Sequence, residues 1–390
     1  MSQHDAAWRT SRAARCHDKG VTFVDAVSIE SVRSLLVDQM IRCNRCENRV
    51  ARGTRQTSVE RERRIACVPD PPQHFDESVA AGEVDRNKVR HGQKATVTAV
   101  NRWILGARPR TLPAAVVPVA IGAGAAVGGS SPMWWRVAPA LIVSLALQVG
   151  VNYSNDYSDG IRGTDDVRVG PVRLVAGGLA QPSQVKRAAF MAFGVAAIAG
   201  LILAIVTTWW MILVGLVAML AGWGYTGGPK PYGYLGLGEL FVFVFFGLVA
   251  TVGTAYVIVE EFPAHSWDAG SAAGFLACAL LVVNNLRDIP TDRASGKHTL
   301  AVRLGDSRTR WLYIVCLASA ATLIIVIAVA WRAWAAIALA GFVVAIPPIR
   351  LVRRGAHGRD LIAVLASTAR TQLIVGLLLA IGLALGPISS

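Results

Sequence analysis

The stretch 152–174, NYSNDYSDGIRGTDDVRVGPVRL, follows an apolar run that is long enough, with its flanks, to cross a lipid bilayer. It carries four carboxylates, Asp156, Asp159, Asp165 and Asp166, in a part of the chain where acidic residues are scarce. A carboxylate at the centre of a bilayer costs about 2.5–3.5 kcal/mol on insertion scales. A cluster of them at a helix end therefore indicates a compensating partner, most simply a divalent metal ion.

The chain has 390 residues, a net charge of +14 and 53% hydrophobic residues, but these averages join two unlike parts. Residues 1–110 are polar and basic, whereas 111–390 are almost continuous apolar segments separated by short polar loops. This predicts an all-α, polytopic membrane domain over 97–390 behind a polar, basic leader over 1–96. The leader buries too little apolar surface to offset its ordering entropy, so we expect it to be disordered or an artefact of the assigned start.

The apolar runs recur often enough to predict nine membrane helices of about 20 residues each. Their predicted ranges are 111–129, 135–153, 188–207, 209–226, 238–259, 270–287, 311–330, 333–349 and 361–385. Loops after the even-numbered helices are long and basic, whereas those after the first, third, fifth and seventh bring only Arg136 and Arg332. The positive-inside rule then places the amino terminus and the even-numbered loops in the cytoplasm.

A second acidic cluster ends the sixth predicted helix, within 284–305, NNLRDIPTDRASGKHTLAVRLG. Asn284, Asp288 and Asp292 are spaced four residues apart, which stacks them on one helical face at about 6 Å per step. Pro290 is expected to bend or end that helix. Because the two clusters fall at corresponding places, we expect two four-helix units plus a final helix, with both clusters on the cytoplasmic side.

These residues favour the chemistry of a diphosphate. There is no G-x-S-x-G nucleophile elbow and no complete P-loop, and His298 is the only histidine beside either cluster. Mg²⁺ is commonly held by one or two carboxylates together with phosphate oxygens, and basic side chains meet the remaining phosphate oxygens. The basic residues interleaved with the carboxylates are Arg162, Arg168, Arg173, Arg287, Arg293 and Lys297. If the diphosphate leaves an allylic carbon, a long hydrocarbon tail can stay in the membrane.

The two motifs make the chain resemble the UbiA-type intramembrane prenyltransferases. The NDxxD signature of that family is matched by Asn155 to Asp159, and its aspartate pair spaced by four is matched by Asp288 and Asp292. Further segments resemble the branch that prenylates 1,4-dihydroxy-2-naphthoate in menaquinone synthesis, and the resemblance runs from about residue 99 to the end. Those segments are GARPRTLPAAVVPV (106–119), NDYSDGIRGTDD (155–166), GPVR (170–173), YTGGPKPYGYLGLGEL (225–240) and the 284–305 stretch.

The resemblance implies a site and a reaction. Mg²⁺ would be held by the catalytic carboxylates Asp156, Asp159, Asp288 and Asp292, with Asn155 in support. The implied substrate-binding residues are Asn155, Arg162, Arg173, Asn284, Arg287 and Lys297, and Lys297 would bind diphosphate or orient the aromatic acid. The implied reaction joins a polyprenyl diphosphate to 1,4-dihydroxy-2-naphthoate at the cytoplasmic side of the bacterial inner membrane, with loss of CO₂ and diphosphate, to give demethylmenaquinone. No nucleic-acid partner is implied.

Other interpretations remain open from the residues alone. The acceptor of a UbiA-type enzyme could instead be 4-hydroxybenzoate or homogentisate. From another class, a secondary transporter would also need polar groups in a membrane bundle, although transporters usually place them near the bilayer midplane. Each arginine beside the motifs also has an ordinary explanation in membrane topology.

Overall fold

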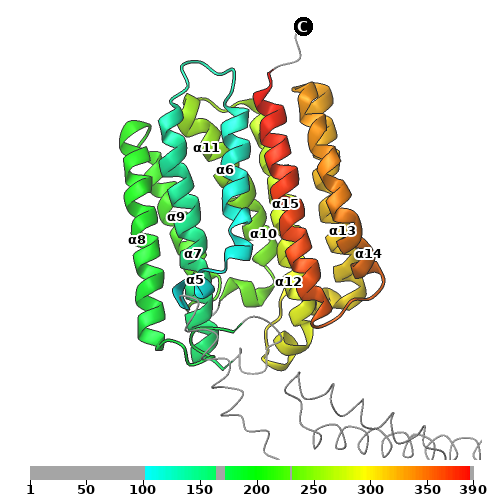
Figure 1. Ribbon diagram of the computed structural model, residues 1–390. Helices are drawn as coiled ribbons and strands as arrows, with labels where there is room; N and C mark the ends of the chain where they lie inside the picture. The colour runs from blue at the N-terminus through cyan, green and yellow to red at the C-terminus, as the bar shows by residue number, and fades with distance from the viewer. Residues whose placement is uncertain (1–101, 164–171, 229–230, 387–390) are drawn as a thin grey trace, which may run out of the picture. The chain divides into compact units, whose positions relative to one another are not determined.

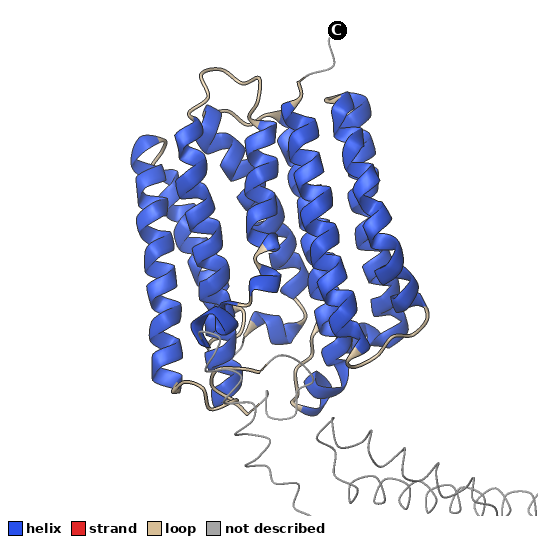
Figure 2. Cartoon of the chain, in the orientation of Figure 1, coloured by secondary structure: helices blue, strands red, loops and turns tan. Residues whose placement is uncertain are grey.

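The computed structural model describes residues 102–163, 172–228 and 231–386, which all belong to one compact unit of the chain. Within these ranges the chain forms helices and no strands, which confirms the all-α prediction (Figure 2). The leader and three motif residues, Asp165, Asp166 and Arg168, lie outside the described residues.

The long helices run side by side, and Figure 1 labels the α-helices. In chain order they are α5 (Arg102–Ala107), η4 (Pro109–Thr111), α6 (Pro113–Ala125), η5 (Trp134–Arg136), α7 (Val137–Ile161), α8 (Pro182–Val206), α9 (Trp210–Gly224), η6 (Tyr232–Leu235), α10 (Gly238–Val242), η7 (Phe243–Val249), α11 (Ala250–Val259), α12 (Ala264–Ala294), α13 (Leu300–Ala330), η8 (Ala333–Ala345), α14 (Ile346–Arg353) and α15 (Asp360–Ala384). Of these, η7 is a π-helix and the other η elements are 3₁₀-helices.

The described part of the chain has seven helices that are long and apolar enough to cross a membrane. They are Trp134–Ile161, Pro182–Val206, Gly238–Val259, Ala264–Ala294, Leu300–Ala330, Ala333–Arg353 and Asp360–Ala384. Two further apolar helices, Pro113–Ala125 and Trp210–Gly224, are shorter than these seven. The chain is therefore a multi-pass membrane protein.

Both helices that carry the acidic motifs are longer than predicted. α7 continues to Ile161, so the NDxxD motif lies within a helix and not after one. α12 continues to Ala294, so Asn284, Asp288 and Asp292 share one helix, as their spacing predicted. Pro290 lies inside α12 and does not end it. The helix that contains Pro290 has neighbours on several sides, since α12 packs against α6, α13, α15 and η7.

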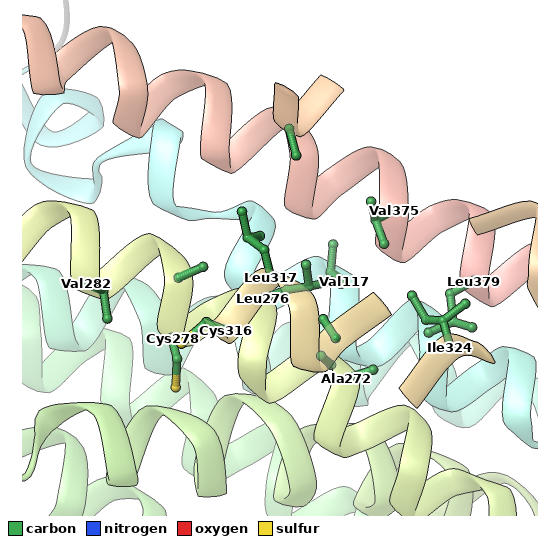
Figure 3. Packing of buried hydrophobic residues seen from close by; sticks show 14 of the residues in the cluster. Val117, Ala272, Leu276, Cys278, Val282, Cys316, Leu317, Ile324, Val375 and Leu379 are labelled. Atoms are coloured by element: carbon green, nitrogen blue, oxygen red, sulfur yellow. The ribbon is translucent and has the colours of Figure 1, made fainter. Parts of the chain in front are cut away.

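The core is centred on α12 and its neighbours, as Figure 3 shows for a cluster that includes Leu276, Leu317 and Leu379. Small residues let the helices approach closely. A Cβ atom on Gly124 of α6 would lie 2.4 Å from the Ala380 carbonyl oxygen of α15, and one on Gly376 would lie 2.3 Å from the Val117 side chain. Such close contact is typical of membrane helices, which associate through packing because lipid offers no hydrophobic driving force.

The two arginines of the short predicted loops lie at the end of the helices away from the acidic motifs, which we call the distal end. Arg136 precedes α7 and donates hydrogen bonds to the carbonyls of Val257 (2.9 Å) and Val206 (2.8 Å). Arg332 follows α13 and donates to the Val127 carbonyl (2.6 Å). Both arginines are buried, so each satisfies helix-end carbonyls instead of facing solvent.

Candidate active site

At the carboxyl-terminal end of α7, Asn155 and Asp159 are four residues apart and lie on one face of the helix. The Asn155 Oδ1 accepts a hydrogen bond from the Thr226 hydroxyl (2.6 Å). The Asp159 Oδ1 accepts from the Lys297 ammonium (2.9 Å) and from the Tyr234 hydroxyl (2.6 Å). This face of α7 is therefore joined to the segments that follow α9 and α12.

Asp156 occupies a different face of α7 and is 1% exposed. Its Oδ2 accepts from the Leu174 backbone N–H (3.0 Å) and its Oδ1 from the Val175 N–H (3.1 Å). Both bonds are charge-assisted, and such bonds are about twice as strong as neutral ones. Asp156 therefore holds the segment 172–175 against α7.

On α12, the predicted stack of Asn284, Asp288 and Asp292 faces the α7 residues. Arg287 makes a two-pronged ion pair with its neighbour Asp288, with Nε–Oδ1 and Nη2–Oδ2 distances of 2.7 Å each. The same guanidinium donates to the Asn284 Oδ1 (2.9 Å). Arg287 is 6% exposed, so it orients the Asp288 carboxylate from behind.

The two acidic faces enclose one small cavity of about 80 Å³, which we call the polar cavity. Its lining residues are Arg108, Asn155, Asp159, Arg173, Tyr225, Thr226, Gly233, Tyr234, Asn284, Asn285, Asp288, Thr291, Asp292, Lys297 and Thr299. The structure thus brings together three of the four predicted metal-binding carboxylates, and the two motifs face each other. Three of the predicted site residues, Asp156, Arg162 and Arg287, are described by the structure but do not line the cavity.

Three cations face the polar cavity: Arg108, Arg173 and Lys297. Burial lowers the pKa of Lys297, but the charge of Asp159 and the hydrogen bond to it raise that pKa, and the net shift is upward. Lys297 is therefore fully charged at neutral pH. Its ammonium also lies 4.7 Å from the centre of the Tyr234 ring, a cation–π distance.

Arg162 lies just beyond α7 and supports a turn. Its guanidinium donates to the carbonyls of Thr226 and Gly228 and lies 5.4 Å from the Tyr234 ring centre. The prediction that Arg162 binds diphosphate directly is not tested by these contacts and stays a prediction.

Sequence reasoning missed Arg108. It has a left-handed backbone (φ 53°), which is uncommon for a residue with a side chain. Its Nη2 donates to the Asn152 carbonyl (3.2 Å), and its own carbonyl accepts from the Thr111 hydroxyl (2.9 Å). The Asn152 amide donates to Ala107 and Thr111, so α7 fixes this turn. The signal available in the sequence was an arginine directly before Pro109 at the start of an apolar run.

A second, larger cavity of about 430 Å³ lies beside the polar cavity, and we call it the apolar chamber. Its walls come from α6, α7, α8, α9, α10, η7 and α11, with Val143, Leu147, Val214, Phe245 and Val252 among the lining residues. Its α7 lining runs from Ala140 to Val151, which is about 16 Å along a helix axis. The molecule therefore offers a charged cavity next to a long hydrocarbon-lined one.

The carboxylates suit a hard divalent cation, since Mg²⁺ prefers oxygen ligands and keeps part of its coordination for water or phosphate. In the described part of the chain, no three metal-ligating side chains converge closely enough to form a complete metal site by themselves. Asp159 and Asp288 are instead paired with Lys297 and Arg287. Additional oxygen ligands, such as those of a diphosphate, would be needed to complete the coordination.

Comparison with known proteins decides the family. Residues 115–365 match the model of the UbiA prenyltransferase family. The chain belongs to this family. The 1,4-dihydroxy-2-naphthoate octaprenyltransferase of Mycobacterium tuberculosis is 50% identical over 288 residues, which is 74% of this chain and 98% of that protein. The Escherichia coli protein of the same name is 34% identical over 235 residues, 57% of this chain and 74% of that protein.

The fold agrees with this assignment. The structure of a UbiA homologue from Aeropyrum pernix covers 69% of this chain and 97% of its own, with a TM-score of 0.52 at 16% identity. The family prediction drawn from the two aspartate motifs is therefore confirmed. In this member of the UbiA family, both motifs border the polar cavity.

Proposed function

We propose that this chain transfers a polyprenyl group from a polyprenyl diphosphate to 1,4-dihydroxy-2-naphthoate, with release of diphosphate and CO₂. The observation that carries the proposal is the contact between a cavity of carboxylates and cations and an apolar chamber, in a chain whose relatives are named for this reaction. A prenyl diphosphate has the same division into a charged head and a hydrocarbon tail.

In this proposal the diphosphate occupies the polar cavity. Mg²⁺ would be held by Asp159, Asp288 and Asp292, with Asn155 beside them, and it supplies positive charge to the departing diphosphate when bound. Lys297 and Arg173 meet phosphate oxygens from the protein side. These groups are charged and held before the substrate arrives, so little reorganisation is needed as the leaving group gains charge.

Three residues that do not line the polar cavity hold other groups of the site in position. Arg287 orients Asp288, Arg162 holds the turn at Thr226 and Gly228, and Asp156 holds the segment that presents Arg173. Arg108 lines the cavity from the α5–α6 side and is a candidate partner for the carboxylate of the aromatic acid. The metal-ligand role predicted for Asp156 stays a prediction.

The reaction balances without a redox partner. The C1–O bond of the prenyl diphosphate breaks with both electrons passing to diphosphate, and the ring carbon that bears the carboxylate of the dihydroxynaphthoate supplies the electron pair that joins it to C1. The carboxylate leaves as CO₂, and its bonding pair restores the aromatic ring. The immediate product is the prenylated quinol, from which demethylmenaquinone forms by a separate two-electron oxidation.

The hydrocarbon tail would lie in the apolar chamber, whose lining can contact an isoprenoid chain without leaving a buried polar group unsatisfied. We further propose that α6 and α9 cross the bilayer together with the seven longer helices. These nine helices would form two four-helix units plus α15, with the amino terminus and polar cavity at the cytoplasmic side of a bacterial inner membrane. The prenyltransferase domain would begin after the leader, near residue 97.

The test is incubation of membranes containing the full chain with radiolabelled polyprenyl diphosphate, Mg²⁺ and one aromatic acid at a time. Labelled prenylated lipid from 1,4-dihydroxy-2-naphthoate alone is the expected result, with Asp288→Asn as the inactive control. Product from 4-hydroxybenzoate or homogentisate instead would change the acceptor. No product from any acid would refute prenyl transfer and favour a transporter.

A further inference from the structure

Tyr225 is the one described residue that lines both the polar cavity and the apolar chamber. It follows α9 directly and caps that helix through its backbone N–H, which donates to the Ala221 carbonyl. Its side chain therefore stands where the charged surroundings end and the hydrocarbon surroundings begin.

Two glycines, Gly233 and Gly238, leave room for the ring of Tyr225. A Cβ atom on Gly233 would lie 3.0 Å from the Tyr225 Cε2, and one on Gly238 would lie 3.3 Å from the same atom. The Gly233 N–H also donates to the Tyr225 carbonyl (3.0 Å). Because larger residues at these two positions would press on the ring, the glycines leave the space that the ring occupies.

Aromatic neighbours complete this support. The Tyr232 ring meets Tyr225 edge to face at 5.6 Å between centroids, and Phe241 stacks on Tyr232 at 3.9 Å. Burial raises the pKa of the Tyr225 hydroxyl, and the nearby charge of Glu239 raises it further. The ring is partly buried and packs against other aromatic side chains, so a cation against its open face would be partly shielded from water, which strengthens the contact.

Tyr225 lies where the reacting bond of the proposed substrate would lie. If diphosphate occupies the polar cavity and the tail occupies the apolar chamber, the bond between them lies at the boundary between the two cavities. That bond is C1–O, the bond that breaks. We propose that the Tyr225 ring contacts the allylic carbons of the bound prenyl diphosphate, stabilises the positive charge that develops there, and keeps water from C1.

This assignment rests on the proposed function. In the productive reaction, C1 loses the diphosphate oxygen with its electron pair and gains a pair from the acceptor ring. If water reaches C1 first, its oxygen supplies that pair and a proton is lost, so the products are polyprenol and diphosphate. The ratio of polyprenol to prenylated acceptor therefore reports how well C1 is shielded, separately from how fast it reacts.

The first test compares substitutions in the full-length membrane protein, with prenylated acceptor, polyprenol and diphosphate measured together. Tyr225→Leu should lower kcat by about tenfold or more, change KM for prenyl diphosphate by only a few-fold, and raise the share of polyprenol. Tyr225→Phe keeps the ring and should lose much less. The matched control is Phe245→Leu, because Phe245 lines the apolar chamber but not the polar cavity. It should act mainly on KM and leave the polyprenol share low.

A second test keeps the shape of the side chain. Phenylalanines with increasing fluorine substitution at position 225 weaken the negative face of the ring while filling the same space, so log kcat should fall stepwise along the series. A flat series, or a Tyr225→Leu protein with wild-type kcat and no polyprenol, would overturn the assignment while the proposed function stands. If the unmodified protein forms no prenylated product, the proposed function fails and the assignment fails with it.

Discussion

Asp156 has two competing roles that a single substitution can separate. As part of the NDxxD motif it is predicted to bind Mg²⁺, whereas in the structure its carboxylate accepts the backbone N–H groups of Leu174 and Val175. Asp156→Asn keeps the size of the side chain but removes the charge. It also turns an N–H₂ group toward one of the two backbone donors, which then has no acceptor.

The magnitude follows from these two bonds. A hydrogen bond to a charged group contributes about 1.5–3 kcal/mol, and an unsatisfied buried N–H costs about 1–3 kcal/mol. A net loss of about 2–4 kcal/mol would weaken the attachment of the segment 172–175 by about 30- to 700-fold. Leu174 is 0% exposed and packs against Tyr153, so burial of its side chain still favours docking. We therefore expect a displaced Arg173 and no general unfolding.

The assay is steady-state prenyl transfer with separate titrations of prenyl diphosphate and Mg²⁺. For Asp156→Asn we expect KM for prenyl diphosphate to rise by about tenfold or more, with the half-saturating Mg²⁺ concentration unchanged at saturating diphosphate. Gly160→Ala is the matched variant, since its Cβ atom would lie 2.5 Å from the Val175 side chain and displace the same segment without altering any carboxylate. It should reproduce the rise in KM.

One outcome would refute this reasoning. If Asp156→Asn raises the Mg²⁺ requirement strongly while Gly160→Ala behaves like the unmodified protein, then Asp156 acts as a metal ligand. The anchoring of residues 172–175 would in that case have little effect on substrate binding.

Three further predictions concern the ion pair, the chamber and the metal. Lys297→Ala removes the ammonium 2.9 Å from Asp159 and should lower kcat/KM by about 10- to 100-fold, whereas an unaffected value would exclude Lys297 from the site. Gly215→Leu projects into open space in the apolar chamber, about 15 Å along α9 from Tyr225, and should raise KM for long-chain but not for short-chain prenyl diphosphates. The control is Gly194→Leu, which also meets open space but lies outside the chamber lining, and equal effects of the two would contradict the tail site. Chelation of divalent ions should abolish turnover and added Mg²⁺ should restore it, so full activity in the chelator would remove the metal from the proposal.

Helical spacing predicted much of the site. Asn284, Asp288 and Asp292 repeat every four residues, and all three line the polar cavity together with Asp159 and Lys297. The same rule also distinguishes Asp156, since Asn155 and Asp159 share a face and Asp156 lies one residue, or about 100°, away from Asn155. The helix predicted from the sequence ended at residue 153, before this motif, whereas α7 continues to Ile161.

Other features depended on contacts between distant segments. Arg108 reaches the cavity because Asn152 and Thr111 hold its left-handed backbone, and the hydrogen bond between those two residues joins positions 41 residues apart. Tyr225 is one of several aromatic residues near a predicted helix end, where belt and packing roles are common. Its position between the two cavities depends on Gly233 and Gly238, which follow in a separate segment.

The distal arginines bear on the proposed orientation of the chain in the membrane. Charge counting treats every loop arginine alike, yet Arg136 and Arg332 are 6% and 7% exposed and bind helix-end carbonyls. Arg136 also forms an ion pair with Glu260. The distal loops therefore present even less exposed positive charge than the sequence count suggests. The count of Lys and Arg is low in these loops whether or not the side chains are buried, and this count favours the proposed cytoplasmic polar cavity, where the water-soluble acceptor can reach the carboxylates without crossing the lipid.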